Sequence, residues 1–158
     1  MDVNLVNPFI EATLNTLETT AALTFTPETA YHKKNGALAA GDVSGLIRVS
    51  GSMAATVSLS FTTSAILNIV SAMFGEEMTE LDDEIRDAVG EIVNMICGQA
   101  NLKIGETHPE LKSELQSVLM TASHSIPHIG DYPVLAVPFS TPFGPFELEF
   151  CFKKEASA

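Results

Sequence analysis

Hydrophobic residues recur every three or four positions in several stretches of the chain, which is the spacing that places them on one face of a helix. The first predicted helix covers about residues 8 to 22, with Asn7 as its N-cap and Pro8 at its first position, where a missing backbone N–H does no harm. A second predicted helix covers residues 63–74 and ends at Gly75, because Gly readily adopts the backbone conformation that terminates helices.

A third helix is predicted to run to about Lys103. Thr79 with Asp82 resembles a capping box, and the acidic residues that surround Asp82 are favourable at the positive end of a helix. A short fourth helix is predicted within THPELKSEL, with Thr107 as its cap and Glu110 closing the box.

Alternation of hydrophobic and polar residues predicts strands elsewhere in the chain. The segment GLIRVSGSMAATVSLSF contains two β-rich runs around Ser50-Gly51-Ser52, which predicts a hairpin. The segment LTFTPETAYHKKN is a weaker strand candidate, because Pro27 interrupts it. The segment SVLMTAS, which follows the predicted fourth helix, is also predicted to be a strand.

A second hairpin is predicted near the C-terminus, where YPVLAVPFS and PFELEFCFK flank a turn at residues 141–144. Hydrophobic residues fall on one face of its last strand: Phe146, Leu148, Phe150 and Phe152. Pro138 lies in the preceding strand and cannot donate a hydrogen bond to a neighbour. That strand is therefore predicted to be an edge strand or to carry a bulge.

The predicted elements follow the order helix, strands, two or more helices, strands, without strict alternation of strand and helix. This order favours an α+β fold in which helices pack on one face of an antiparallel sheet. Of the 158 residues, 46% are hydrophobic, which is enough for a core without a disulfide or a metal. No repeat, linker or low-complexity segment divides the chain, so residues 1–158 are predicted to form a single domain.

The chain has 8 basic and 20 acidic residues, a formal net charge of −12. This charge repels nucleic acids and anionic membranes, and favours a partner with a basic face. The sequence has no signal-peptide pattern and no apolar stretch approaching the roughly 20 residues of a membrane span, which predicts a cytoplasmic protein. Cys97 and Cys151 lie in apolar segments without metal-type spacing. They are predicted to be core residues in a reducing compartment; a disulfide between them is the alternative.

The third predicted helix carries a polar stripe, because residues three and four positions apart share one helical face. The stripe consists of Asp87, Glu91, Asn94 and Gly98. The opposite face is apolar and sufficient for burial, with Ile85, Ala88, Val89, Ile92, Val93 and Ile96. The polar stripe is therefore predicted to be exposed.

This stripe has two interpretations. Exposed Glu and Asn residues are ordinary on a helix that faces solvent. Asn is, however, a mediocre helix former, and Gly98 costs the helix about 1 kcal/mol relative to Ala. Gly98 also removes bulk beside Asn94, which lets another surface approach closely. These two details indicate a contact site.

The segment LDDEIRDAVGEIVNMICGQAN resembles the signature helix of the CheC/CheX/FliY-type chemotaxis phosphatases. The motif of that family is an acid or Ser, three residues, Glu, two residues and Asn, and it is matched by Asp87, Glu91 and Asn94. The segments VSGLIRVSGSMAATVSLSF and VPFSTPFGPFELEF also look like CheX-type segments. The resemblance extends across most of the chain and implies a CheC-like fold.

The resemblance implies an enzyme of two-component signalling, a protein aspartyl-phosphate phosphatase that acts on a phosphorylated CheY-like receiver domain. It implies that the partner supplies Mg²⁺ and the phosphorylated Asp, so that this chain has no cofactor or metal of its own. Asn94 would orient the attacking water, and Glu91 would pair with the active-site Lys of the receiver. Asp87 would be a peripheral docking charge and Gly98 would admit the partner. The alternative is a non-catalytic module of the same fold that binds a receiver or serves as a sensory output domain.

Some family members carry a second copy of the motif on another helix. Here the first helix offers Glu11 and Asn15, which are four residues apart instead of three, so the single-centre CheX-like type fits better. The family also has a Pro downstream of the Asn, and Pro127 is the best match if THPELKSEL is an insertion. The CheX type is similar in being a homodimer formed through sheet pairing, which implies an interface at an edge strand near residues 133–153.

Other types of site lack a complete set of residues. His124 and His128 are four residues apart, but Pro127 excludes the helix that would align them, and no carboxylate or thiol completes a zinc site. No Ser-His-Asp order or G-x-S-x-G element occurs, so a hydrolase with its own nucleophile is not predicted.

Overall fold

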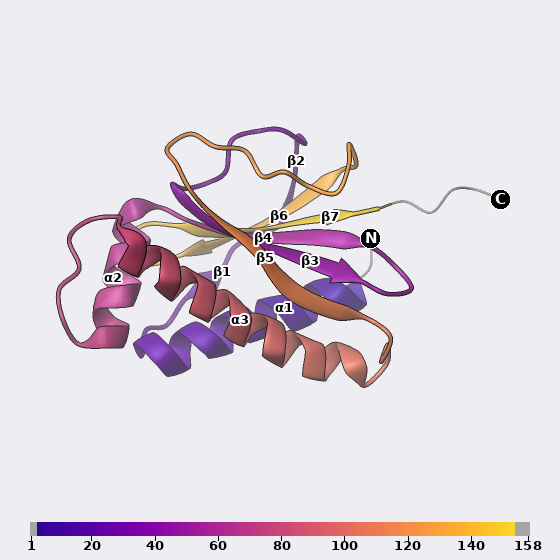
Figure 1. Cartoon of the computed structure of the whole chain (residues 1–158), viewed down its shortest axis with the longest axis horizontal. Coiled ribbons are helices and arrows are strands. Elements are labelled where there is room, and N and C mark those ends of the chain that lie inside the picture. Colours follow the sequence, from indigo (N-terminus) through magenta and orange to yellow (C-terminus); the bar gives the residue numbers. More distant parts are fainter. Residues whose placement is uncertain (1–2, 154–158) are drawn as a thin grey trace.

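The computed structural model describes residues 3–153, in which three helices lie on one face of a seven-stranded antiparallel sheet (Figure 1). The helices are α1 (Val3–Ala21), α2 (Thr63–Phe74) and α3 (Asp83–Gly105). The strands are β1 (Thr26–Pro27), β2 (Tyr31–Lys33), β3 (Val43–Ser50), β4 (Ala55–Phe61), β5 (Lys112–Met120), β6 (Val134–Ser140) and β7 (Phe146–Phe152). This is the α+β architecture that the order of elements predicts.

The strands lie across the sheet in the order β1, β6, β7, β4, β3 and β5, and β2 pairs with β6 beside β1. Both predicted hairpins are present, since β3 pairs with β4 and β6 pairs with β7. Strands β4 and β7 come from distant parts of the chain and pair along their full lengths in the middle of the sheet. Strand β5 pairs with β3 alone and forms one edge.

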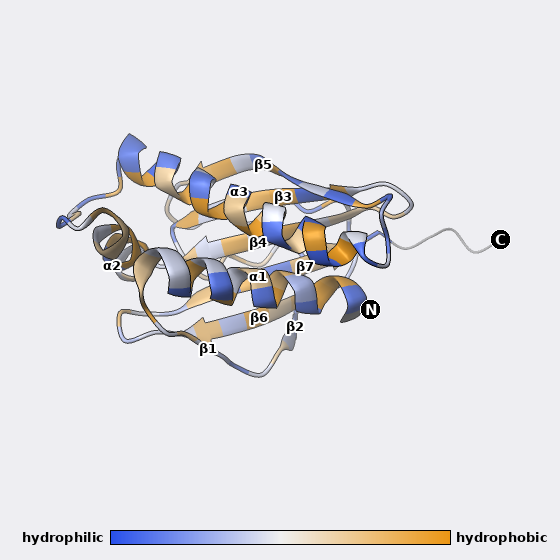
Figure 2. Cartoon of the chain, turned by 90° about the horizontal axis from the view of Figure 1, so that it is seen from below, coloured by the Kyte–Doolittle hydropathy of each residue, from blue (hydrophilic) through white to orange (hydrophobic). Residues whose placement is uncertain are grey.

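The hydrophobic core lies between the helices and the sheet, where α1 and α3 lie side by side over the strands (Figure 2). The apolar face predicted for the last strand is present, and Phe146, Leu148 and Phe150 are fully buried. The ring of Phe9 in α1 meets the ring of Phe150 edge-on, with centroids 6.2 Å apart. Such aromatic contacts add specific geometry to the burial of apolar area, and they fix α1 on the sheet.

The opposite face of the sheet is polar and yet buried, with Ser44, Thr56, Ser58, Ser60, Glu147 and Glu149. The segment 121–133 passes over this face (Figure 1). Its two His residues bond to the strands: His124 Nε2 lies 2.7 Å from Ser44 Oγ, and His128 Nδ1 lies 2.7 Å from Thr56 Oγ1. Both faces of β4 are therefore buried, although its sequence alternates between polar and apolar residues.

A buried ionic cluster connects β2 to β7 on this polar face. Lys33 Nζ lies 3.1 Å from Glu147 Oε1 and 3.0 Å from Glu149 Oε2. His128 Nε2 lies 3.0 Å from Glu149 Oε1, and the Tyr31 hydroxyl donates to Glu147 Oε2 at 2.7 Å. Buried carboxylates need partners of this kind, because an unpaired buried charge is costly.

Helix α1 begins earlier than predicted. It starts at Val3, so Asn7 is an interior residue instead of the N-cap, and Pro8 lies inside the helix. The preceding turn is helical because Leu5 and Val6 are buried in the core. Burial of each such side chain contributes about 1.5–3 kcal/mol. Together they offset the roughly 3 kcal/mol that an interior Pro costs a helix.

Helix α3 also begins at a different residue from the one predicted. Its N-cap is Asp82, whose Oδ1 accepts a hydrogen bond from the Ile85 N–H at 3.1 Å. Asp82 has the extended backbone of an N-cap, with φ −130° and ψ −173°, so the helix cannot begin before it. The capping box headed by Thr79 is therefore wrong, whereas the end near Lys103 is confirmed.

The segment predicted as a fourth helix forms a turn and then the edge strand β5. The amide of Asn101 in α3 holds the start of β5, because its Oδ1 accepts from the Ser113 N–H at 2.8 Å and its Nδ2 donates to the Ser113 carbonyl at 3.0 Å. The backbone of β5 also pairs with the backbone hydrogen-bonding groups on the outer side of β3. These tertiary hydrogen bonds outweigh a weak local helix preference. The segment is thus an integral part of the sheet. That it is an insertion relative to the family stays a prediction.

The edge predicted near residues 133–153 is only partly present. Strand β7 is interior, and β1 and β2 cover much of the outer side of β6, whereas β5 is an uncovered edge. Pro138 lies between the two short pairings of β6, and its carbonyl accepts a hydrogen bond from the Glu28 N–H at 2.8 Å. Pairing of two chains through a sheet edge stays a prediction.

Candidate functional site

Helix α3 carries the predicted site, and its inner face fixes it on the sheet. The residues predicted to be buried are 0–2% exposed: Ile85, Ala88, Val89, Ile92, Val93 and Ile96. At the start of the helix, Asp83 and Glu84 follow the Asp82 cap. Their negative charges interact favourably with the positive end of the helix dipole. A long helix anchored along one side presents its other side as a rigid surface.

The four predicted site residues lie on the outer side of α3. Asp87, Glu91, Asn94 and Gly98 are all exposed. Within residues 3–153, the side chains of Glu91 and Asn94 form no hydrogen bond or ion pair. An inward-pointing Asn94 or an internally paired Glu91 would have contradicted the predicted roles. Both side chains are instead free to contact a partner.

A shallow groove lies beside these residues, between α3 and β5. Its lining residues are Arg86, Asp87, Gly90, Glu91, Asn94, Leu115 and Val118. The strand packs against the helix at Gly90, where an added Cβ would lie 3.6 Å from Leu115 Cδ2, an ordinary van der Waals distance. Arg86 donates from Nη1 to the Val118 carbonyl at 2.9 Å, which ties the first turns of α3 to β5.

The β5 side of this groove was not predicted from the sequence, because Leu115 fell within the expected fourth helix. The available signal was the alternation in the segment LKSEL, where Leu111 and Ser113 are buried and the intervening Lys112 is exposed. Period-two alternation of this kind is typical of strands.

Gly45 of β3 determines how closely α3 approaches the sheet. A Cβ at this position would lie 2.5 Å from Val93 Cγ2, which is shorter than real contacts allow. Val93 precedes Asn94 in the chain, so the close approach occurs directly beneath the site. A β-branched side chain is stiff and cannot easily rotate away.

Gly45→Ala is expected to lower the free energy of unfolding by about 1–3 kcal/mol, because the added methyl overpacks the helix–sheet contact. The double variant Gly45→Ala/Val93→Ala should recover part of this loss, since it removes the clashing methyl groups. Urea unfolding monitored by circular dichroism measures both effects. Gly90→Ala is the matched control, because its Cβ would make only ordinary contacts. Wild-type stability of Gly45→Ala would contradict the prediction.

A carboxylate and a carboxamide one turn apart can bind a charged group and orient a water molecule. Asn94 offers a donor and an acceptor without charge, and Glu91 offers a charged acceptor. The thiols do not provide a nucleophile, because Cys97 and Cys151 are buried, as predicted; they form no disulfide. Burial raises the pKa of the Cys97 thiol to about 11, so it is protonated at neutral pH.

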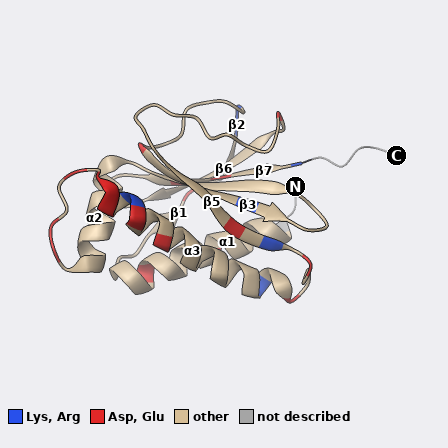
Figure 3. Cartoon of the chain, viewed as in Figure 1, with Lys and Arg blue, Asp and Glu red and all other residues tan. Residues whose placement is uncertain are grey.

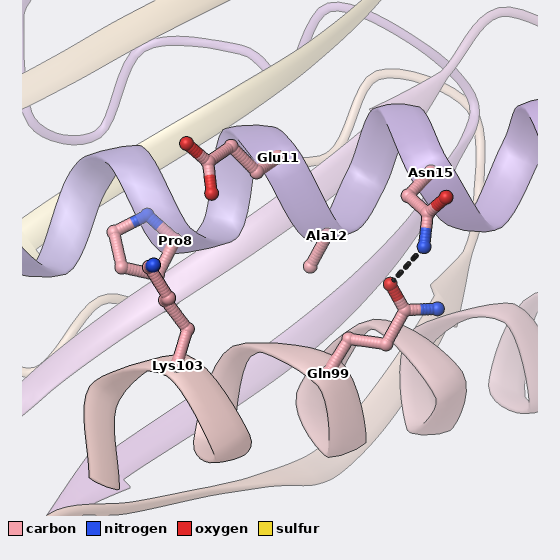
Figure 4. Close-up of a pocket in the computed structure, with 6 residues that line it drawn as sticks. All are labelled: Pro8, Glu11, Ala12, Asn15, Gln99 and Lys103. Carbon is pink, nitrogen blue, oxygen red and sulfur yellow. Dashed lines mark hydrogen bonds between the residues drawn. The ribbon is translucent and has the colours of Figure 1, made fainter. Parts of the chain in front are cut away.

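The second polar pair, on α1, is arranged differently. Glu11 and Asn15 line a hollow between α1 and α3, together with Pro8, Ala12, Gln99 and Lys103 (Figure 4). Asn15 Nδ2 donates to Gln99 Oε1 at 2.7 Å, and Gln99 Nε2 donates to Thr16 Oγ1 at 3.1 Å. The Asn15 amide therefore holds the two helices together, and the pair does not repeat the arrangement of Glu91 and Asn94.

Pro127 is not close to the predicted site. It lies in the segment that covers the polar face of the sheet, whereas α3 packs on the other face (Figure 1). The neighbouring His124 and His128 contact the strands, as described above.

No group of three or more His, Cys, Asp or Glu residues within residues 3–153 is arranged to hold a metal ion. No helix in the same range is long and apolar enough to cross a membrane.

The family described as chemotaxis phosphatase CheX matches residues 43–140 of this chain. This range includes α3 and all of the predicted site residues. The comparison with curated protein sequences gave no significant match.

Several solved structures are similar to this chain. A CheC-like superfamily protein from Shewanella sp. PV-4 is 34% identical, with a TM-score of 0.88 over 98% of this chain and 100% of that chain. The chemotaxis protein CheX from Vibrio vulnificus is 34% identical, with a TM-score of 0.84 over 94% of this chain and 99% of that chain. A chain of the CheX–CheY–BeF3–Mg²⁺ complex from Borrelia burgdorferi has a TM-score of 0.75 over 97% of this chain and 100% of that chain. At 19% identity, that last likeness shows the fold alone.

Proposed function

Because the chain belongs to the CheX family of chemotaxis phosphatases, we propose that it hydrolyses the aspartyl phosphate of a CheY-like receiver domain, with Asn94 and Glu91 as its catalytic residues. The observation that carries this proposal is the exposed pair itself. Glu91 and Asn94 lie one turn apart on a helix anchored to the sheet, and neither has an internal partner within residues 3–153. The Borrelia complex, whose name places CheX with CheY, BeF3 and Mg²⁺, supports the choice of partner.

The reaction requires little from this chain. A water oxygen forms a bond to phosphorus, the bond between phosphorus and the aspartyl oxygen breaks, and the Asp leaves as a carboxylate. The proton of the water passes to the inorganic phosphate. In the proposed complex the receiver contributes Mg²⁺ and a Lys that neutralise the phosphoryl oxygens. The missing contribution is a water held in line with the bond that breaks.

Asn94 is suited to this role because its carboxamide is uncharged. It can enter a site rich in phosphoryl oxygens without repulsion, accept a hydrogen bond from the water and donate one to a neighbouring oxygen. The helix that carries Asn94 is already fixed on the sheet through its buried face. Little backbone conformational entropy is therefore lost when the water is bound.

Glu91 would form a charge-assisted hydrogen bond with the receiver Lys, and this contact would set the register of Asn94 in the site. Asp87, one turn earlier, would add a peripheral attraction to the same basic surface. Gly98 would leave room for the receiver one turn after Asn94. A single-domain organisation over residues 1–158, a homodimer and a cytoplasmic location are further parts of the proposal.

The test is the loss of acyl phosphate from each purified receiver of the organism that encodes this chain, measured with Mg²⁺, with and without the protein. The protein is expected to shorten the lifetime of one or a few phosphorylated receivers at substoichiometric concentration. Binding to a phosphorylated receiver with an unchanged lifetime would instead indicate the non-catalytic adaptor.

Glu91→Gln is expected to weaken binding of the receiver about tenfold, because a hydrogen bond to a charged group contributes about 1.5–3 kcal/mol. The salt dependence of binding should fall with it. Asp87→Asn is the matched control and should have a smaller effect. Equal effects of the two substitutions would show that Glu91 acts only through net charge.

A further inference from the structure

The outer face of α3 changes from acidic to apolar along its length. At 3.6 residues per turn, one arc of about 100° holds the whole exposed stripe: Glu84, Asp87, Glu91, Asn94, Met95, Gly98 and Leu102. The acidic members lie in the N-terminal half of the helix (Figure 3). Beyond Asn94 the stripe is apolar, with Met95 36% and Leu102 78% exposed. Leu102 is the most exposed large hydrophobic residue of the described chain.

Gly98 separates these two apolar side chains. It follows Met95 by three residues and precedes Leu102 by four, so the three positions adjoin on the helix surface. A Cβ at Gly98 would have no atom within 4 Å, so packing within the described chain does not require a Gly there. Gly also destabilises a helix interior relative to Ala. A mid-helix Gly without an internal reason indicates close approach of a molecule outside the chain.

We propose that Met95, Gly98 and Leu102 form an apolar notch that binds a hydrophobic side chain of the receiver, next to the phosphorylation site of that receiver. Gly98 is the floor of the notch, and Met95 and Leu102 are its walls. This inference rests on the proposed function, because it takes Glu91 and Asn94 to be in contact with the receiver. The notch adds affinity and selects among receivers without touching the reacting atoms.

The size of a protein interface favours the receiver as the occupant. A standard interface buries about 800 Å² on each partner, a patch of roughly 16 Å radius. Leu102 follows Asn94 by eight residues, about 12 Å along the helix axis. A receiver centred on Asn94 therefore covers the notch as well. A second copy of this chain is disfavoured, because it brings the same formal charge of −12 to an already acidic helix.

The test uses receivers activated with BeF3⁻ and Mg²⁺ for binding, and phosphorylated receivers for turnover. Leu102→Ser is expected to weaken binding about tenfold and to raise KM by a similar factor, with kcat within about twofold of wild type, because uniform binding is lost. Gly98→Ala is expected to weaken binding while the melting temperature stays equal or rises. If Gly98 had a purely structural role, Gly98→Ala would not weaken binding while leaving the melting temperature unchanged or higher.

Leu38→Ser is the matched control. Leu38 is 58% exposed and pairs through its backbone with Ser125, in the segment that covers the opposite face of the sheet, so its substitution should leave binding unchanged. Wild-type binding by both Leu102→Ser and Gly98→Ala would overturn the notch, as would a loss of self-association by Leu102→Ser in sedimentation. If receivers bind through the notch but keep their acyl phosphate, the proposed phosphatase activity is contradicted and the notch is not. Failure of every receiver to bind would overturn both.

Discussion

Asn94→Ala is expected to lower the rate of receiver dephosphorylation by about 100-fold or more, because the attacking water loses the group that orients it. The loss should appear in kcat, since the receiver still supplies the metal and the electrostatic stabilisation. The side chain is exposed and has no partner within residues 3–153, so its removal leaves the fold intact. Ala is also the better helix former, and the melting temperature should therefore not fall.

Single-turnover kinetics with a phosphorylated receiver measure this effect, and binding to the BeF3⁻-activated receiver measures docking separately. Docking should persist, because Glu91 and the rest of the helix surface are unchanged. Asn94→Asp has the same shape but carries a negative charge, and it should be inactive because it repels the phosphoryl oxygens.

Asn68→Ala is the matched control for these variants. Asn68 is half-buried on α2, and its amide donates to the Ser64 carbonyl of its own helix at 2.8 Å. Its substitution should leave the dephosphorylation rate unchanged. A wild-type rate in Asn94→Ala would contradict the water-orienting role and would leave Glu91 as the only candidate for catalysis on this helix.

Lys33→Met is expected to lower the free energy of unfolding by about 3–5 kcal/mol, the usual cost of removing one partner of a buried ionic contact. The variant keeps most of the volume of the side chain but leaves Glu147 and Glu149 buried side by side without a cation. His128 then remains as a partner of Glu149 alone. Urea unfolding at pH 7 measures the loss.

The pH dependence follows from the shifted pKa values in this cluster. Burial by itself would raise the pKa of Glu149, but the hydrogen bonds from His128 and Lys33 and the charge of Lys33 more than offset burial and hold the pKa below its ordinary value of 4.5. The contribution of Glu149 to stability is therefore present above pH 4.5 and is lost as the pH falls through the lower pKa of the folded state.

Lys33 changes in the opposite sense. Burial alone would lower its pKa, but its contacts with Glu149 and Glu147 raise the pKa above 10.5. Its contribution is present below pH 10.5 and is lost as the pH rises through the higher folded value. In Lys33→Met the contacts of Lys33 no longer offset burial, which favours the protonated form of Glu149. The stability difference from wild type should therefore be large at pH 7 and should narrow as the pH falls towards 4.

Lys34→Met is the matched control for this substitution, because Lys34 is the next residue, is exposed and forms no ion pair with a described residue. It should change stability little at any pH. A stability loss in Lys33→Met that stays constant from pH 7 to pH 4 would show that lost packing, and not unpaired charge, is the cause.

Much of the site could be predicted from the sequence because it depends on one helix. The spacing of Asp87, Glu91, Asn94 and Gly98 fixes their shared face, whatever the helix packs against. The apolar residues on the other side then leave no choice about which face is buried. The groove beside them could not be predicted, because Leu115 and Val118 reach it only through the pairing of β5 with β3.

Two of the errors in the predicted elements have a common physical origin. The start of α1 and the segment 107–115 both depend on contacts with distant residues, such as Asn101 with Ser113. The cap of α3 is a different error, because Asp82 is itself a local alternative to Thr79. Local capping and propensity terms are about 1 kcal/mol each. Burial and backbone hydrogen bonds from the tertiary structure are larger in sum, and they decided the first two cases.

The sequence by itself determined the fold class, the two hairpins and the polar stripe of α3, because each depends on the period of hydrophobic residues within one segment. The tertiary structure decided the strand order, the partners of Glu147 and Glu149, and the surroundings of Asn94. Buried polar groups must be satisfied by whichever groups lie nearest in space, and one-dimensional spacing does not specify which groups those are.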